Sequence, residues 1–162
     1  MTKIPELALA VRQPWAWAII HGGKDIENRT PHAVALGGMR KTRIAIHASR
    51  GLGRGEYESA SQFMAGIGVI CPPAIDLQRG GLIGCVDVID IVREHASPWW
   101  FGPVGLVLAN PQPCLFTPAL GELGFYRWQP ANPPNLPEPA KWMLPKAQPE
   151  LTLATDDQGA LL

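Results

Sequence analysis

The sequence contains no long hydrophobic run and no recognisable export signal. None of its apolar stretches approaches the roughly 18 residues that a membrane-spanning helix requires. No positively charged segment followed by an apolar segment, the mark of a secretory leader, is visible near the N-terminus. We therefore expect a cytoplasmic monomer that does not associate with a membrane.

Cysteine is also scarce. The three cysteines are far apart and odd in number, which indicates neither a disulfide framework nor a zinc site of paired cysteines. The four histidines show no spacing typical of metal ligands, so we expect reduced, mostly buried cysteines, no metal and no cofactor. The alternative is a metal held by residues distant in sequence. These residues are Cys71, Cys85, Cys114, His21, His32, His47 and His95.

An overall charge of either sign is absent, because 14 Lys and Arg balance 14 Asp and Glu. This balance argues against salt-driven binding of nucleic acid over the whole surface. The charges are nevertheless uneven: residues 1–54 hold nine of the basic residues against three acids, a balance of +6. Unless folding mixes the charges evenly, this predicts one positive face or cleft that captures a short polyanion or a single phosphate.

The sequence does contain enough apolar residues for one compact core, with 46% hydrophobic residues among 162. Its 17 Gly and 17 Pro predict many turns and little long helix. Alternation and β-branched residues predict strands, and one weakly amphipathic segment predicts a helix at 56–65. The predicted strands are 43–47, 82–92, 104–110 with its end at Pro111 and Pro113, and 123–128.

Proline is concentrated at the C-terminal end, where seven prolines fall between Pro130 and Pro149. Such a segment is unsuited to a central strand or a helix. We therefore predict one domain over 1–128 and a Pro-rich C-terminal tail over 129–162, extended or loosely packed, with Trp142, Met143 and Leu144 as possible anchors.

The most informative segment is 9–30. Leu7, Leu9 and Val11 alternate as in a half-buried strand, Pro14 occupies a position where a helix begins, and Gly22-Gly23 ends that helix. Arg12 precedes the helix N-terminus, where free N–H groups favour an anion. The other interpretation is that Arg12 pairs with a nearby carboxylate.

Three charged residues follow this helix within six positions: Lys24, Glu27 and Arg29. Glu27 and Arg29 share one face of a strand, whereas Lys24 and Glu27, three apart, face opposite sides unless a turn or bulge intervenes. The alternative to a functional cleft is a solvated edge whose ion pairs contribute about 0 to 1 kcal/mol each.

These residues resemble a family. The motifs Val11-Arg12-Gln13-Pro14-Trp15 and Gly23-Lys24-Asp25-Ile26-Glu27-Asn28-Arg29-Thr30 are similar to those of the ASCH domain, which is related to the PUA fold. The resemblance covers roughly residues 5–128 and implies an α+β fold, a small PUA-like mixed β-barrel with short helices capping its ends and a cleft that meets RNA or a nucleoside. Further matching segments are 46–49, 81–84, 97–102 and 106–110.

The resemblance also suggests an enzyme, because some small ASCH proteins are amidohydrolases of acetylated cytidine and others are linked to RNA cleavage. Lys24 matches the amidohydrolase lysine, but Glu27 stands where the nucleophilic threonine would be, and Thr30 is out of register. A carboxylate cannot replace that hydroxyl in acyl transfer, although Glu27 can activate water while Lys24 or Arg29 stabilises an oxyanion.

Other candidates lie on the predicted strands and loops. The loop 97–102 carries three aromatics, of which we expect one to be exposed for stacking on a base and the others to pack inside. Asp87 and Asp90 interrupt an apolar strand, and an inward-facing one would be a general base or a partner for Lys24 or Arg29; a solvated strand face is the alternative for both.

We expect the protein to bind single-stranded RNA or a pyrimidine nucleoside in a positive cleft, with hydrolysis of RNA or acetylated cytidine as one alternative. The third possibility is a protein interaction module that uses the Pro-rich tail. Lys24 and Glu27 are the catalytic candidates. The ligand-binding candidates are Arg12, Gln13, Trp15, Arg29, His47, Ser49, Trp99 and Trp100.

Overall fold

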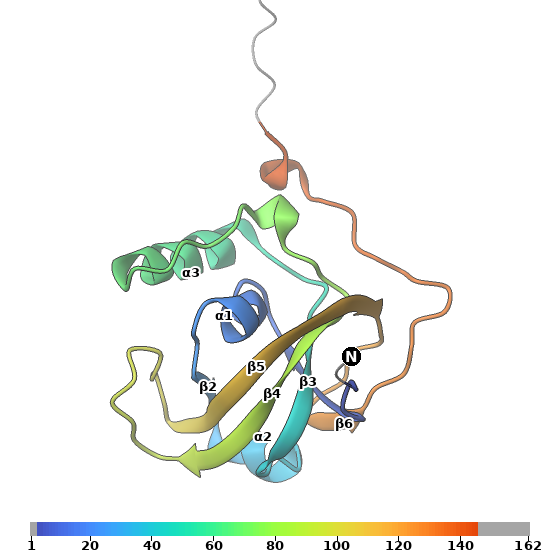
Figure 1. Cartoon of the computed structure of the whole chain (residues 1–162). Helices are drawn as coiled ribbons and strands as arrows, with labels where there is room; N and C mark the ends of the chain where they lie inside the picture. Colours follow the sequence, from blue (N-terminus) through green and yellow to red (C-terminus); the bar gives the residue numbers. More distant parts are fainter. Residues whose placement is uncertain (1–2, 146–162) are drawn as a thin grey trace, which may run out of the picture.

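The computed structural model describes residues 3–145 and shows a strongly curled six-stranded sheet with three short α-helices (Figure 1). The strands follow the order β2-β5-β4-β3-β1-β6 across the sheet. β1 and β3 are parallel, and the other neighbours are antiparallel. The strands are β1 (Leu7–Val11), β2 (Ile26–Arg29), β3 (Thr42–Ala48), β4 (Gly81–Val92), β5 (Val104–Pro118) and β6 (Phe125–Arg127).

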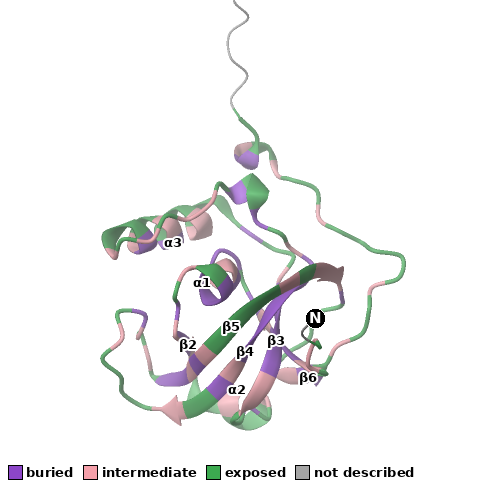
Figure 2. Cartoon of the chain, in the orientation of Figure 1, coloured by how far each residue is buried: buried purple, intermediate pink, exposed green. Residues whose placement is uncertain are grey.

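Helix α1 (Trp15–His21) packs inside the curl of the sheet (Figure 1). Its Ile19 and Ile20 belong to the same buried cluster as apolar residues of β1, β3, β4 and β5. In Figure 2, buried residues, drawn in purple, are therefore found on α1 and on the central strands. The sheet and this helix thus form the core, as expected for a half-barrel whose apolar inner face must be covered by another element.

The helix ends are specified locally. The Gln13 side chain accepts the Trp17 N–H at 2.9 Å, and the Gly22 N–H closes the helix on the Ala18 carbonyl at 2.9 Å. Helix α2 (Pro31–Leu36), which the sequence analysis did not predict, begins at Thr30, whose hydroxyl accepts from Ala33 N–H at 3.1 Å.

Helix α3 (Arg54–Gly66) confirms the predicted helix at 56–65 within two residues at its start and one at its end. The predicted strands at 43–47 and 82–92 are confirmed as β3 and β4. The predicted strand 123–128 is confirmed as the shorter β6, because Gly124 adopts a positive φ of 68° and its Cα lies against Gly37.

The predicted end of the strand 104–110 at Pro111 is wrong, because β5 continues through Pro111 and Pro113 to Pro118. β2 pairs with β5 over Val104–Val107, and beyond Val107 no strand within residues 3–145 pairs with this edge of β5 and needs its N–H groups. Proline is tolerated at such an edge.

The chain after β6 runs as an extended strap along one side of the molecule to the short 3₁₀ helix η2 (Lys141–Met143) (Figure 1). Met143 is buried against Leu52, Ala74 and Leu77, whereas Leu144 is exposed and does not anchor the strap. The predicted tail over 129–162 stays a prediction, and its residues 146–162 lie outside the described part of the chain. The boundary at 128 remains a prediction.

No helix within residues 3–145 is both long and apolar enough to span a membrane.

Candidate functional site

A turn between α1 and β2 brings Lys24 to Glu27. Gly23 has a φ of +77°, and Lys24 precedes β2, so it is not bound by the alternation of that strand. The Lys24 ammonium lies 3.2 Å from Glu27 Oε1 and also donates to the Ile26 carbonyl. The turn that the sequence analysis required for cooperation between Lys24 and Glu27 is therefore present.

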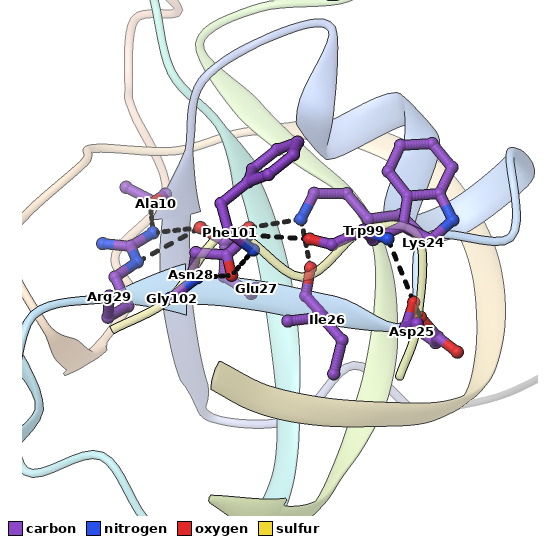
Figure 3. Close-up of polar contacts among 11 residues, drawn as sticks. Ala10, Lys24, Asp25, Ile26, Glu27, Asn28, Arg29, Trp99, Phe101 and Gly102 are labelled. Atoms are coloured by element: carbon purple, nitrogen blue, oxygen red, sulfur yellow. Dashed lines mark hydrogen bonds and ion pairs between the residues drawn. The ribbon is translucent and has the colours of Figure 1, made fainter. Parts of the chain in front are cut away.

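Arg29 completes the group from the same face of β2 as Glu27. Its Nε and Nη2 donate to Glu27 Oε2 at 3.1 and 2.8 Å, and Nη2 also donates to the Ala10 carbonyl at 3.1 Å. Figure 3 shows the Glu27 carboxylate between Lys24 and Arg29. Both carboxylate oxygens are thus occupied by cationic donors.

This group is partly withdrawn from solvent: the side chains of Lys24, Glu27 and Arg29 are 3%, 10% and 24% exposed. Buried charges are tolerated only when they are paired and hydrogen-bonded. Two cations face one carboxylate, which leaves one positive charge uncompensated within the group. Among the hydrogen bonds of residues 3–145, none uses Arg29 Nη1, so Arg29 is the member best able to meet a ligand.

Aromatic rings cover the ammonium of Lys24, which lies 5.7 Å from the Trp15 ring centre and 5.9 Å from that of Trp99. Trp99 is only 4% exposed, so it has no open face for a nucleobase. The exposed ring of this loop is Phe101, at 56%, and it packs edge-on against Trp15 at 6.2 Å. The structure therefore confirms one exposed aromatic in this loop, which is Phe101, whereas of the two predicted stacking residues, Trp99 and Trp100, Trp99 is buried.

Hydrogen bonds from the segment Lys24–Arg29 fix the position of the aromatic loop 97–102. The Asn28 side chain accepts from the N–H groups of Phe101 and Gly102 at 2.8 and 3.0 Å, and it donates to the Trp99 carbonyl at 2.9 Å (Figure 3). Trp100 is half-buried and packs over Gly105. The sequence analysis missed Asn28, because nothing local to an Asn in a strand reveals a loop more than 70 residues away.

Arg12 lies elsewhere. It forms a bidentate ion pair with Glu56. The Glu56 carboxylate also accepts a hydrogen bond at 3.0 Å from the N–H of Gly53, the residue before α3. The hydrogen bond from Arg12 lowers the pKa of Glu56 and outweighs the opposing effect of burial. The interpretation of Arg12 as a partner of a nearby carboxylate is confirmed, and its contacts do not include the Lys24–Glu27–Arg29 group.

Gln13 is buried and fully engaged in the fold. Besides capping α1, it donates to the Gln78 carbonyl at 2.7 Å. Its role as a ligand-binding residue therefore remains a prediction without a free polar atom to support it.

His47 and Ser49 line a cavity of about 380 Å³ beside the charged group. Ala10 links the two, because its carbonyl accepts from Arg29 and its backbone pairs in register with His47. The remaining lining residues are Arg50, Gly121, Glu122 and Leu123. His47 and Ser49 therefore share a cavity with Ala10, the residue whose carbonyl accepts from Arg29, while Lys24, Glu27 and Arg29 are not among its lining residues.

Asp87 and Asp90 do not serve Lys24 or Arg29. Asp87 pairs with Arg43 at 2.9 Å and accepts from Asn110 at 2.8 Å, and Asp90 is exposed. The hypothesis that one of them is the partner of Lys24 or Arg29 is wrong, since Glu27 fills that role. In the described part of the chain, no cluster of three or more His, Cys, Asp or Glu is arranged to hold a metal ion.

A curled six-stranded sheet with short helices is the architecture of the PUA-like α+β class. The family model of the ASCH domain matches residues 9–134, and the chain belongs to that family. The resemblance seen in the motifs around Arg12 and Lys24 is therefore confirmed over most of the chain. None of the curated proteins compared with the sequence matches it significantly.

Proposed function

We propose that this protein binds single-stranded RNA at the surface formed by Arg29 and the exposed ring of Phe101. One observation carries the proposal: the Lys24–Glu27–Arg29 group holds two cations on one carboxylate and exposes part of Arg29. Membership of the ASCH family supports an RNA-related function in general terms.

The two parts of this surface suit the two parts of a nucleotide. The uncompensated charge of the group attracts a phosphate, because neutralising phosphates releases counterions. Phe101 offers a ring on which a base stacks, and its backbone is fixed by Asn28. The protein as a whole carries no net charge, so we expect few phosphate contacts and a shallow salt dependence.

Hydrolysis is the weaker alternative. A general base must be able to take a proton from water, but Oε1 of Glu27 is paired with the Lys24 ammonium and Oε2 accepts two hydrogen bonds from Arg29. The Lys24 side chain is 3% exposed beneath two tryptophan rings. We therefore assign Glu27 a positioning role, in which it orients Lys24 and Arg29 for binding.

The alternative of a protein interaction module that uses the Pro-rich tail has little support in residues 129–145. In this segment, η2 packs on the protein's own core through Met143.

The test is a fluorescence anisotropy titration of a labelled single-stranded RNA of about ten nucleotides at two salt concentrations. We expect Arg29→Met to weaken binding about 10- to 100-fold, the loss of one charge-assisted hydrogen bond. The slope of log Kd against log salt should fall by about one.

Arg54→Met is the matched control, because Arg54 is largely exposed and pairs with Glu58 along α3. It removes the same charge without touching the proposed surface, so its affinity should stay close to that of the wild type. If both variants lost RNA affinity equally, the interaction would depend on the total charge of the protein and not on the proposed surface. No RNA binding by the wild type would refute the proposal.

A further inference from the structure

A second cavity lies between the strap and the loop that joins the 3₁₀ helix η1 (Ala74–Asp76) to β4. Its volume is about 230 Å³, less than the roughly 300 Å³ at which pockets for drug-sized ligands begin. At about 30 Å³ for each water molecule, it has room for a ligand of about eight non-hydrogen atoms. Arg29 and Phe101, which form the proposed RNA surface, are not among its lining residues.

The walls of this cavity are apolar except at Gln78 and Arg79. A pocket of this kind favours a ligand that is mostly apolar and carries one polar group. The strap and the body of the protein both contribute to the walls. The apolar side chains of the body include Leu77 and Phe116, and those of the strap include Leu136 and Met143.

Arg79 differs from the other partly buried arginines in its ion pairing. Three arginines of residues 3–145 are partly buried, and two of them have a carboxylate partner: Arg29 pairs with Glu27 at 2.8 Å and Arg43 with Asp87 at 2.9 Å. Arg79 forms no ion pair with any Asp or Glu of residues 3–145. Since a charge withdrawn from water normally requires a counter-charge, Arg79 is suited to an anionic ligand.

Arg50 adds a second positive charge beside Arg79. Arg79 Nη1 donates to the Arg50 carbonyl, and the Arg50 side chain donates to the Asn135 carbonyl of the strap. Burial lowers the pKa of Arg79, and the charge of Arg50 lowers it further. A bound anion would oppose both effects, because it favours the charged form of the guanidinium.

The contact of Arg79 with Met143 shows that the guanidinium itself reaches the cavity. Arg79 Nη2 lies 3.9 Å from Sδ of Met143, and the Met143 side chain forms part of the cavity wall. A guanidinium has five N–H donors, and the hydrogen bonds of Arg79 to residues 3–145 use two of them, one on this weakly accepting sulfur. The remaining donors suffice for the two parallel hydrogen bonds of an arginine–carboxylate pair.

Gly80 holds the backbone beside Arg79 against the strap. Its φ of +86° is a conformation that glycine adopts without strain, and its N–H donates to the Ala48 carbonyl at 2.7 Å. A Cβ at Gly80 would lie 3.4 Å from Pro137 Cδ and 3.5 Å from Arg50 Cγ. The backbone that carries Arg79 is therefore fixed without a ligand.

We propose that this cavity binds a small aliphatic monocarboxylate, with its carboxylate on Arg79 and its hydrocarbon chain against the apolar walls. The carboxylate supplies one negative charge, and its two oxygens match the planar guanidinium. A phosphate fits this cavity poorly, because its additional oxygens require donors that apolar walls do not supply. Hexanoate, with about eight non-hydrogen atoms, has a suitable size.

The experiment is an NMR titration of the whole chain, labelled with ¹³C at the methionine methyl groups, with hexanoate. Met143 lines the cavity, whereas Met39 and Met64 lie in other buried clusters and serve as internal controls. Met143→Leu assigns the signal of Met143. We expect hexanoate to shift this signal saturably and to leave those of Met39 and Met64 unchanged. Hexanol and inorganic phosphate should bind more weakly by about tenfold or more.

Arg79→Met removes the charge and keeps an unbranched apolar side chain. It should weaken hexanoate binding by about tenfold or more and leave hexanol binding unchanged, because it removes a charge-assisted hydrogen bond that only the carboxylate makes. Arg93→Met is the matched control: Arg93 is exposed and does not line the cavity, so this variant should bind hexanoate as the wild type does.

The proposal is overturned if hexanoate leaves the Met143 signal unchanged, if Arg79→Met binds hexanoate as well as the wild type, or if phosphate or hexanol binds as tightly as hexanoate. Thermal unfolding shows whether each variant is folded. If Arg79→Met does not fold, the comparison of hexanoate with hexanol on the wild type still tests the charge. None of these outcomes bears on RNA binding at Arg29, which is measured separately.

Discussion

Arg29 on β2 donates to the carbonyl of Ala10 on β1 at 3.1 Å, although β5, β4 and β3 separate these two strands in the order of the sheet. The curl of the sheet brings the two strands together, and this bond links them. Because Ala10 also lines the His47 cavity, the charged group and the cavity share one wall.

Glu27→Gln should destabilise the protein by about 3 to 5 kcal/mol, because the buried Lys24 ammonium would lose its carboxylate partner. Urea unfolding followed by circular dichroism measures the change in the free energy of unfolding. Glu58→Gln serves as the control, since the exposed Arg54–Glu58 pair contributes at most about 1 kcal/mol. Similar losses in the two variants would show that Glu27 does not hold Lys24 in place.

Phe101→Ala should weaken binding of single-stranded RNA by about 1 to 3 kcal/mol, the usual contribution of one base stacked on an aromatic ring. Its ring is largely exposed, so we expect the unfolding midpoint to change little. Anisotropy titrations compare it with Leu115→Ala, which removes another exposed apolar side chain from β5. An affinity equal to that of the wild type would remove Phe101 from the proposed surface.

The stability of the protein should fall as the pH drops below about 6.5, the usual pKa of histidine. Burial lowers the pKa of His47 in the folded state, so the unfolded chain takes up this proton at a higher pH than the folded protein does. Protonation therefore favours unfolding between the unfolded pKa and the lower folded pKa.

The measurement is the unfolding free energy of the wild type and His47→Phe between pH 7.5 and 5, where the difference between the two curves isolates His47. Tyr126 packs edge-on against its ring at 6.4 Å, and Glu122 and Arg50 line the same cavity. Parallel curves would contradict a neutral, buried His47.

Met143→Ala should cost about 2 to 5 kcal/mol if the strap is an integral part of the fold, because the side chain fills a buried site among Leu52, Ala74 and Leu77. Leu144→Ala, at an exposed neighbouring position, should have little effect. Limited proteolysis should cut the Met143 variant within 129–145 faster than the wild type. Unchanged stability would mean that the strap is only loosely attached.

Some features of this site could be read from the residues themselves. Glu27 and Arg29 are two apart in a strand, so their shared face follows from backbone geometry alone. The helix between Pro14 and Gly22, the strands β3 and β4 and the family membership were likewise evident from local pattern and motif.

Other features depended on segments that are distant in sequence. Trp99 and Phe101 are both aromatic residues of one loop, and only the tertiary structure decided that Trp99 is buried and Phe101 exposed. Arg12 pairs with Glu56, which lies 44 positions away in the sequence. β5 continues through its prolines because the pairing of β2 with β5 stops at Val107.

The sequence by itself determined the strand alternation, the turn glycines and the charges available near Lys24, because those depend on neighbours within a few residues. Only the tertiary structure decided that Arg29 reaches Ala10, and that Gly121 and the Ala119 carbonyl lie beside His47, 72 positions before Ala119. Such contacts depend on the curl of the whole sheet, which results from the packing of all its strands around α1 and not from any one segment.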